Sequence, residues 1–178
     1  MFKGLKYYSL GDYAKRAAWA LVLPLFRFSP RLCHGWRRFL LRVFGAKIGA
    51  RVQVFPSVQI AFPWNLVIGS RSVVAWDVRL YALGRIEIGE RVVISQAAHL
   101  CAGTHDYEGE GFPLLKKDIR VGDDVWVGAD AFVGPGVKVA RCAVVAARAV
   151  VVKDVQEQAV VAGNPARFIK TRNKRFQL

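Results

Sequence analysis

Aliphatic residues recur at intervals of six along most of this 178-residue chain. In fifteen hexads the repeated residue is Ile, Leu or Val, and the next residue is Gly, Ala, Ser or Cys in twelve of them. The fifteen positions are Ile48, Val54, Ile60, Ile68, Val74, Leu80, Ile88, Ile94, Leu100, Val121, Val127, Val133, Val139, Val145 and Val151. A period of six does not match the 3.6-residue turn of an α-helix, but it fits a short strand followed by a tight corner.

Such hexads predict an all-β prism of stacked parallel strands. The aliphatic side chains would point inward as a continuous ladder, so that each coil is stabilised by its neighbours. Three hexads make one triangular coil, and two extra residues, at 66–67 and 86–87, follow the first two sets of three. We therefore expect about five coils, at residues 48–65, 68–85, 88–105, 121–138 and 139–156. A β-sandwich is the alternative, but it gives no reason to keep phase over fifteen hexads.

The regular pattern is interrupted by residues 106–120 (DYEGEGFPLLKKDIR). This segment directly follows the third predicted coil and begins with acidic and glycine residues, which favours an external loop. Long loops that leave a regular scaffold often carry functional residues. The loop and the end of the coil before it are therefore the first place to look for a site.

The residues that precede the inward aliphatics should point outward and form three columns. Two columns contain apolar residues: Gln53, Val73, Val93, Trp126 and Val144 form one, and Gln59, Arg79, His99, Phe132 and Val150 form the other. The third column is entirely polar, with Asn65, Arg85, His105, Lys138 and Gln156. An apolar column on the outside is unusual for a monomer. We therefore expect contact with other copies of the chain, most simply in a homotrimer.

The net charge of +14 is concentrated at the two ends of the chain. Residues 1–47 hold ten Lys or Arg against the single acid Asp12, and residues 166–178 hold five and no acid. The middle, residues 48–165, holds twelve basic and twelve acidic side chains. Basic ends of this kind suit nucleic acid, anionic lipid or a phosphate-rich small molecule. A nucleic-acid role lacks any supporting motif of basic and aromatic residues.

Both ends lack the hexad, so the chain divides into an N-terminal segment, a solenoid and a C-terminal segment. Within residues 1–47 the segment WRRFLLRVF has apolar residues at helical spacing with arginines between them, which predicts an amphipathic helix. Such a helix would cap the open end of the solenoid at 48–165, and a basic amphipathic helix is also able to lie on an anionic membrane. Residues 166–178 are expected to form a short basic helix.

Composition argues against several other classes of protein. The apolar run of residues 17–26 is ten residues long and contains Pro24, about half of the ~20 residues that a membrane-spanning helix needs. The sequence shows no secretory signal pattern, so we expect a cytoplasmic protein. Cys33, Cys101 and Cys142 are far apart and have no Cys or His spacing typical of zinc, so neither a disulfide framework nor a metal site is predicted.

Several segments resemble the signature of hexapeptide-repeat acetyltransferases. They are IRVGDDVWVGADAFVGPGVKV, VVKDV and VVAGNPARFIK, all within residues 119–172. The pieces SPRLCHGWRRFLLRVFGAKIG and FPWNLVIG are similar to the branch of colanic acid (exopolysaccharide) biosynthesis acetyltransferases. The resemblance covers nearly the whole chain and implies a left-handed parallel β-helix, acetyl-CoA as acyl donor and a homotrimer. It further implies an acceptor that is a sugar or a lipid-linked saccharide.

His105, in the segment CAGTHDY, matches the position of the family's catalytic histidine at the end of a coil before the external loop. An alcohol that attacks a thioester must lose its proton, and imidazole titrates near neutral pH. The resemblance therefore implies that His105 is the general base. An isolated surface histidine without a role is the alternative.

The resemblance also implies a set of contacts with acetyl-CoA, from Trp126, Gly128, Ala129, Ala147, Lys153, Arg167 and Lys170. Trp126 would line the acyl-CoA cleft, or serve only in packing between subunits. Backbone N–H groups near Gly128 and Ala129 would stabilise charge on the thioester oxygen. The three basic residues would face the phosphates of the coenzyme, although each is also compatible with a solvated surface charge.

The substrate side of the site departs from the family pattern. The position of a substrate-binding Asn in maltose and galactoside acetyltransferases is Ala75 here, and Asp77 is the nearby residue able to accept a hydrogen bond from a sugar hydroxyl. His99 is interpreted as an outer-face neighbour of His105 on a different corner. A nucleophilic pair of Cys101 with His105 is possible on spacing, but the family transfers the acyl group directly.

The function expected from these observations is O-acetylation of a sugar hydroxyl in exopolysaccharide biosynthesis, with acetyl-CoA as donor and no metal. An N-acetyltransferase acting on an amino sugar or a xenobiotic would keep the same fold. A non-catalytic β-helix that serves as a scaffold or binding subunit is the third possibility. Peripheral contact with a membrane through the basic N-terminal segment is compatible with the first of these.

Overall fold

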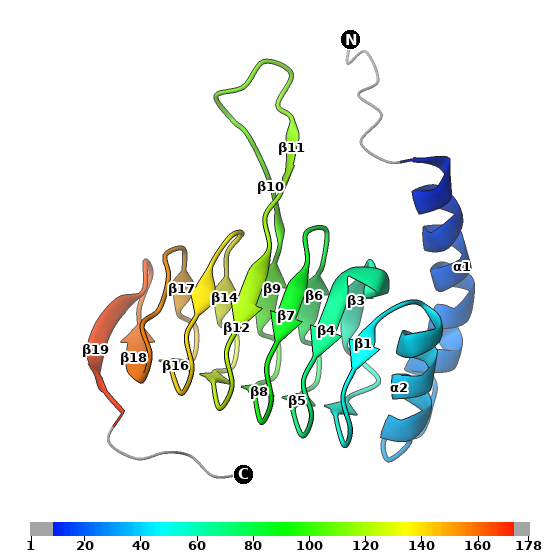
Figure 1. The fold of residues 1–178 in the computed structure, drawn as a ribbon, viewed down its shortest axis with the longest axis horizontal. Helices are drawn as coiled ribbons and strands as arrows, with labels where there is room; N and C mark the ends of the chain where they lie inside the picture. Colours follow the sequence, from blue (N-terminus) through cyan, green and yellow to red (C-terminus); the bar gives the residue numbers. More distant parts are fainter. Residues whose placement is uncertain (1–8, 173–178) are drawn as a thin grey trace.

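The computed structural model describes residues 9–172, in which three parallel sheets form the sides of a prism (Figure 1). Sheet 1 contains β1 (Lys47–Ile48), β4 (Leu66–Ile68), β7 (Ile86–Ile88), β12 (Ile119–Val121) and β15 (Lys138–Val139). Sheet 2 contains β2 (Gln53–Val54), β5 (Val73–Val74), β8 (Val93–Ile94), β13 (Trp126–Val127), β16 (Val144–Val145), β18 (Ala159–Ala162) and β19 (Arg167–Thr171). Sheet 3 contains β3 (Gln59–Ala61), β6 (Arg79–Tyr81), β9 (His99–Cys101), β14 (Phe132–Val133) and β17 (Val150–Val151).

The hexad aliphatics form the core of the prism, as predicted. Val54, Val74 and Ile94 stack in register on sheet 2, and none of their side chains is exposed. The residue before each of them points outward, which produces the alternating burial along these three strands. The fold is a left-handed parallel β-helix, so the predicted fold class is confirmed.

The number of coils is slightly larger than the predicted five. Val155 forms a parallel bridge with Val139, and β18 adds a further parallel strand to β16 on sheet 2. These two segments begin a sixth, incomplete coil, so the fifth coil ends before Val155 rather than at residue 156. The sequence pattern ended at Val151 because the spacing between Val151 and Val155 is four rather than six residues.

The corners of the prism explain why a small residue follows most inward aliphatics. At the corner from sheet 1 to sheet 2, a Cβ built on Gly69 would lie 2.5 Å from the carbonyl carbon of Gly89 in the next coil. Real side-chain carbons do not come this close to backbone atoms. Glycine at this corner therefore lets adjacent coils approach to hydrogen-bonding distance.

Two helices cover the open end of the first coil. Helix α1 (Leu10–Arg27) begins at Ser9, whose hydroxyl forms a capping box with Asp12, and α2 (His34–Val43) follows after a short turn. Trp19 and Phe26 of α1 and Leu40 and Leu41 of α2 are buried in the hydrophobic core. Among residues 9–172, no helix combines the length and hydropathy that crossing a bilayer requires.

Side chains of these helices donate hydrogen bonds to the carbonyl groups at the edge of the first coil, where no preceding coil exists. The pairs are Trp19 Nε1 to Ile60 O (2.9 Å), Arg37 Nε to Val54 O (2.6 Å), Arg38 Nη1 to Val52 O (2.8 Å) and Arg42 Nη2 to Ile48 O (2.6 Å). A sheet edge that is buried without partners would leave backbone acceptors unsatisfied. The arginines predicted on an amphipathic helix therefore complete the first coil.

The C-terminal segment differs from the helix that we expected for residues 166–178. Residues Arg167–Thr171 form β19, which pairs antiparallel with β18 and so closes the opposite end of sheet 2. One edge of β18 has no further coil to pair with. Its backbone N–H and C=O groups form hydrogen bonds with the basic segment, which is therefore a strand. Residues 173–178 lie outside the described range of the chain.

The interruption at residues 106–120 is a projecting hairpin rather than an irregular loop. β10 (Gly103–His105) and β11 (Leu114–Lys116) pair antiparallel, and the arm that they form extends well beyond the prism (Figure 1). The arm leaves the corner between sheets 3 and 1. β12 then resumes the prism in register with β7.

The close approach at Gly69 yields a stability prediction. Gly69→Ala should lower the free energy of unfolding by about 1–3 kcal/mol, because the added methyl group overlaps the backbone of the next coil. Gly35→Ala, in α2, is the control: its Cβ would lie 3.7 Å from Arg38 Nη2, an ordinary van der Waals contact, so the variant should be neutral or stabilising by up to about 1 kcal/mol. Urea unfolding followed by circular dichroism measures both, and equal stability of the two variants would contradict the packing argument.

Candidate active site

His105 lies at the end of β10, where the chain leaves the prism and enters the arm. Its side chain is exposed, and its ring stacks on Phe112 with centroids 4.6 Å apart and an interplanar angle of 13°. The Nδ1 atom lies 2.9 Å from the carbonyl oxygen of Phe112. Phe112, in the loop just before β11, therefore fixes the orientation of the ring.

This contact also identifies the ring nitrogen that carries a proton. A carbonyl oxygen only accepts hydrogen bonds, so Nδ1 must carry the proton that it donates to Phe112 O. In neutral imidazole, Nε2 then holds an unshared electron pair. His105 is accordingly oriented as a base with Nε2 as its basic atom.

The structure does not support the polar column that we expected to contain His105. The outward residues of sheet 1 are Lys47, Val67, Glu87, Arg120 and Lys138, paired in register. Asn65 lies instead in a short 3₁₀ helix (η1, Pro63–Asn65), and His105 lies on the arm. The two-residue insertions precede Ile68 and Ile88, so the residues immediately before these aliphatics occupy the outward positions.

Four of the predicted coenzyme-contacting residues lie on sheet 2 or in the turns that follow it: Trp126, Gly128, Ala129 and Ala147. Trp126 is outward on β13, 48% exposed, and donates from Nε1 to Ser95 Oγ at 2.9 Å. It borders a hollow of about 310 Å³ that is also lined by Arg172. Ala129 lies in the following turn.

The backbone N–H of Gly128 is not available to a ligand, contrary to our expectation. It donates to the carbonyl of Val145 at 2.8 Å, within the stacking between coils. A Cβ on Gly128 would meet Ala147 N at 2.6 Å, so Gly128 and Ala147 are in close contact. The role that remains for Gly128 is to permit this approach.

Asp77 is exposed in the turn between β5 and β6, on the same corner as Ala129 but two coils closer to the N-terminal end. Its backbone φ is 57° and its N–H donates to Ser57 Oγ at 3.0 Å. His105 leaves the prism from a different corner. Asp77 and His105 therefore lie on different corners of one chain, and they are not stacked in successive coils.

The basic residues expected to contact the coenzyme lie toward the C-terminal end. Lys153 and Arg167 line a hollow of about 380 Å³ at this end, together with Phe168. Lys170 lies farther along β19, opposite Val160 of β18. Lys153 and Arg167 therefore share one surface, and Lys170 extends it along sheet 2.

The two alternative groups near His105 have other partners. His99 is half-buried on the outer face of sheet 3 against Phe132, and burial lowers the pKa of its imidazole, with Arg79 adding to the effect. The Cys101 thiol donates to Gly103 O at 3.3 Å. Neither of these contacts involves the His105 ring, so the geometry favours neither a second base nor a Cys–His pair.

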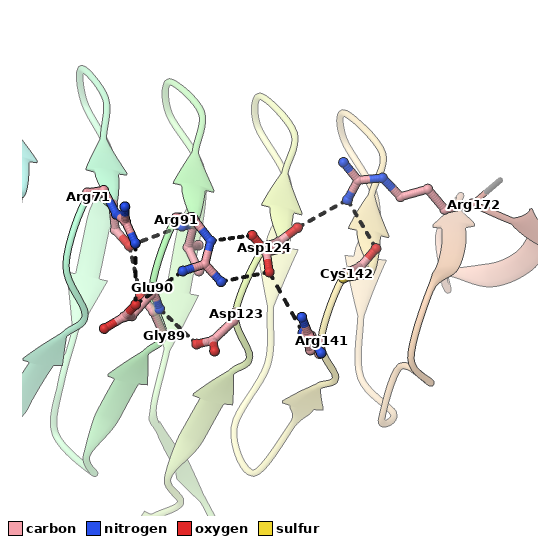
Figure 2. Close-up of polar contacts among 11 residues, drawn as sticks. Arg71, Gly89, Glu90, Arg91, Asp123, Asp124, Arg141, Cys142 and Arg172 are labelled. Carbon is pink, nitrogen blue, oxygen red and sulfur yellow. Dashed lines mark hydrogen bonds and ion pairs between the residues drawn. The ribbon is translucent and has the colours of Figure 1, made fainter. Parts of the chain in front are cut away.

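A network of charged residues borders the Trp126 hollow at the corner between sheets 1 and 2 (Figure 2). Arg91 makes two hydrogen bonds to the Asp124 carboxylate, from Nε to Oδ1 at 2.7 Å and from Nη2 to Oδ2 at 2.9 Å. Arg172, which follows β19, donates to the carbonyl oxygens of Asp124 and Cys142 at 3.1 Å each. The network therefore ties the C-terminal strand to the wall of the hollow.

Comparisons with known proteins agree with this architecture. No protein-family profile matches the chain. The chain is 44% identical over 154 residues to a protein of Escherichia coli strain K12 named "Putative colanic acid biosynthesis acetyltransferase WcaF", covering 86% of this chain and 85% of that protein. The chain belongs to the hexapeptide-repeat acetyltransferases.

Solved structures of this family superpose closely on the acetyltransferase. A hexapeptide-repeat acetyltransferase from Vibrio cholerae O1 biovar eltor, solved with acetyl coenzyme A, has a TM-score of 0.85 at 25% identity, covering 97% of this chain and 95% of that one. A galactoside acetyltransferase in complex with coenzyme A has a TM-score of 0.86 at 25% identity, covering 94% and 85%. The enzyme class predicted from the sequence is thus confirmed as an acetyltransferase.

Sequence reasoning missed two features of this acetyltransferase. Phe112, which holds the His105 ring, is recognisable only once the hairpin pairs β10 with β11. The Arg91–Asp124 pair could have been found, because both residues stand three positions after a sheet 1 aliphatic in successive coils. If the equivalent corner residues of successive coils are aligned, Arg91 of one coil lies next to Asp124 of the following coil.

The Arg91–Asp124 pair predicts a pH-dependent loss of stability. Hydrogen bonds from Arg91 hold the pKa of Asp124 below its usual value, so the pair contributes fully above the ordinary Asp pKa of about 3.9 and its contribution is lost as the pH falls below it. Asp124→Asn should therefore destabilise the protein by about 1–3 kcal/mol at pH 7 and progressively less in acid.

Thermal unfolding from neutral to acidic pH measures this difference. Asp130→Asn is the matched control, since Asp130 is exposed and 3.7 Å from Arg148, and it should change stability by less than about 1 kcal/mol. A constant difference between wild type and Asp124→Asn across the pH range would contradict the assignment.

Proposed function

We propose that the chain transfers the acetyl group of acetyl-CoA to a hydroxyl group of a sugar in exopolysaccharide biosynthesis. The orientation of His105, with Nδ1 donating to Phe112 O, is the observation that carries this proposal. The similarity to the colanic acid protein supports the sugar class, and the two neighbours solved with acetyl coenzyme A or coenzyme A support the donor. A cytoplasmic location belongs to the proposal, because acetyl-CoA is a cytoplasmic metabolite.

In the proposed reaction, Nε2 of His105 accepts the proton of the sugar hydroxyl as its oxygen attacks the acetyl carbonyl. A C–O bond forms, the C–S bond of the thioester breaks, and the proton passes from the imidazolium to the departing thiolate. Acetyl-CoA supplies the activated acetyl group, and the protein supplies a base at a fixed position. The reaction needs no metal or redox group.

The remaining contacts are assigned by the chemistry of the coenzyme. The N–H of Ala129 is the proposed donor to the thioester oxygen, and Trp126 and Ala147 are proposed to line the path of the pantetheine arm. Lys153, Arg167 and Lys170 are proposed to face its phosphates, since a continuous basic surface at the C-terminal end suits several negative charges. Asp77 is the proposed acceptor for a second hydroxyl of the sugar.

A homotrimer belongs to the same proposal. His105 leaves one corner of the prism, whereas Asp77, Ala129 and Ala147 lie on another. In a threefold ring, the arm of one subunit would reach the neighbouring corner of the next, and the two groups would share one cleft. The outward apolar residues of sheet 2, including Val93, Trp126 and Val144, would be covered by this contact.

The proposed base is tested by His105→Ala. Turnover should fall by about 10²–10⁴-fold while the fold is retained, because the ring is exposed and stacks on Phe112 of the arm. Release of free thiol from acetyl-CoA in the presence of a panel of sugars measures the rate, and circular dichroism checks the fold. His99→Gln is the matched control and should stay within a few fold of wild type, whereas near-normal turnover in His105→Ala would exclude this residue as the base.

The proposed trimer is tested by substitutions on two faces of the prism. Wild type should elute with three times the mass of one chain, and Val144→Glu on sheet 2 should dissociate it, because a charge would be buried in the contact. Val67→Glu, on the outer face of sheet 1 between Lys47 and Glu87, is the control and should remain trimeric. Light scattering that shows a stable wild-type monomer at micromolar concentration would remove the trimer.

A further inference from the structure

Helix α1 has a face of apolar side chains that points away from the prism. Its buried residues, Trp19 and Phe26, face the first coil, and Trp19 Nε1 donates to Ile60 O. On the opposite side Leu10 is 89% exposed, Leu21 80% and Phe28 88%. Helical spacing aligns these residues with further exposed positions, so one side of the helix is apolar along its whole length. This outer apolar face consists of Leu10, Tyr13, Ala14, Ala17, Leu21 and Leu25 on α1 and of Phe28, which follows the helix.

The apolar surface continues onto α2 and the turn before it. Leu32, Trp36, Phe39 and Val43 are all exposed. The Trp36 ring stacks on Phe39 at 5.7 Å between centroids, and its Nε1 donates to the carbonyl of Leu25 at 3.1 Å. The exposed sides of the two helices are thereby joined at one end of the molecule (Figure 1). Soluble proteins seldom leave so many large apolar side chains in water without a partner.

The charge around this surface is positive. Residues 9–47 contain eight Lys or Arg and one acid, Asp12, which is engaged in the capping box of α1. Six of these basic residues are exposed, among them Lys15, Arg27 and Arg31, whereas Arg37 is buried against the first coil. An apolar helix face at an end of the molecule with net positive charge is the combination that binds at the headgroup level of an anionic bilayer.

We propose that the outer apolar face docks on an anionic membrane surface and that the acetyltransferase works there on a lipid-linked saccharide. The docking rests on the helices alone, and the identity of the acceptor rests on the proposed function. Helix α1, at 18 residues, is about 27 Å long and would lie flat in the interface. The inner faces of the helices cap the first coil, and their outer faces enter the lipid.

The position of the arm agrees with an acceptor held at the membrane. β9, from which the chain enters the arm, is separated from β3 of the first coil by only one strand, β6. Two strand spacings amount to about 10 Å, so the base of the arm is close to the capped end. The arm and the N-terminal end of α1 extend beyond the same side of the prism (Figure 1). A sugar chain that rises from the lipid surface would therefore be within reach of His105.

Vesicle sedimentation of the full-length protein tests the docking. Wild type should sediment with phosphatidylcholine vesicles that contain phosphatidylglycerol, and several-fold less with phosphatidylcholine alone or at high salt. The double variant Leu21→Asp/Phe28→Asp should reduce binding to the anionic vesicles by at least about tenfold, because two apolar contacts become charges of the wrong sign. Val152→Asp/Ile169→Asp is the matched control, since both residues are more than half exposed at the opposite end, and it should bind as wild type does.

Two further measurements separate the alternatives. Absence of wild-type binding to anionic vesicles, or unchanged binding of the Leu21→Asp/Phe28→Asp variant with a native circular dichroism spectrum, would overturn the proposal. A change in the mass of that variant without vesicles would show instead that the face joins copies of the chain. Its thiol release with a soluble sugar should stay within about twofold of wild type, since the substitutions lie outside the active site. Vesicle binding without any acetyl transfer would sink the proposed function and leave the docking intact.

Discussion

Successive coils of the prism hold one another through parallel backbone hydrogen bonds and a shared inward ladder of aliphatic side chains, and the other features follow from this stacking. It requires residues without bulk at the corners, as at Gly69, where a methyl group would overlap the next coil. It also leaves two edges whose backbone groups have no further coil to pair with. The N-terminal edge is closed by α1 and α2, and the C-terminal edge of sheet 2 is closed by β19.

The arginines of α2 both complete the hydrogen bonding of the first coil and give that end of the molecule its positive charge. A guanidinium group supplies several donors in a fixed plane, which suits the carbonyl groups that line the first coil. Arg37 is fully buried and has no acidic partner among the contacts that surround it, since it donates to the carbonyls of Val54, Pro30 and Arg31 and to the hydroxyl of Ser29. Completing the first coil in this way makes that end of the molecule positive.

The fold could be predicted from the sequence because every hexad repeats the same local requirement, so that fifteen weak signals reinforce one another. The outward column assigned to His105 was wrong because a two-residue insertion shifts the frame, which places Val67 and Glu87, not Asn65 and Arg85, beside the inward aliphatics. The helix expected after residue 166 was wrong for a different reason. A strand at Arg167–Thr171 is stabilised by the free edge of β18, and no local pattern reports a partner of that kind. The orientation of His105 by Phe112 likewise depends on a pairing across the hairpin, while its catalytic role was inferred from the resemblance and stays a proposal.

The arm is inserted without disturbing the prism. Ile119 of β12 pairs with Ile86 of β7, although thirty-two residues separate them in sequence, so the coils meet as they would if the hairpin were absent. Changes in the length or composition of the hairpin should therefore leave the packing of the hydrophobic core unchanged. Under the proposed function, a scaffold of this kind would let residues on the arm change without a cost in thermal stability, so that replacing the hairpin becomes a practical way to probe acceptor specificity.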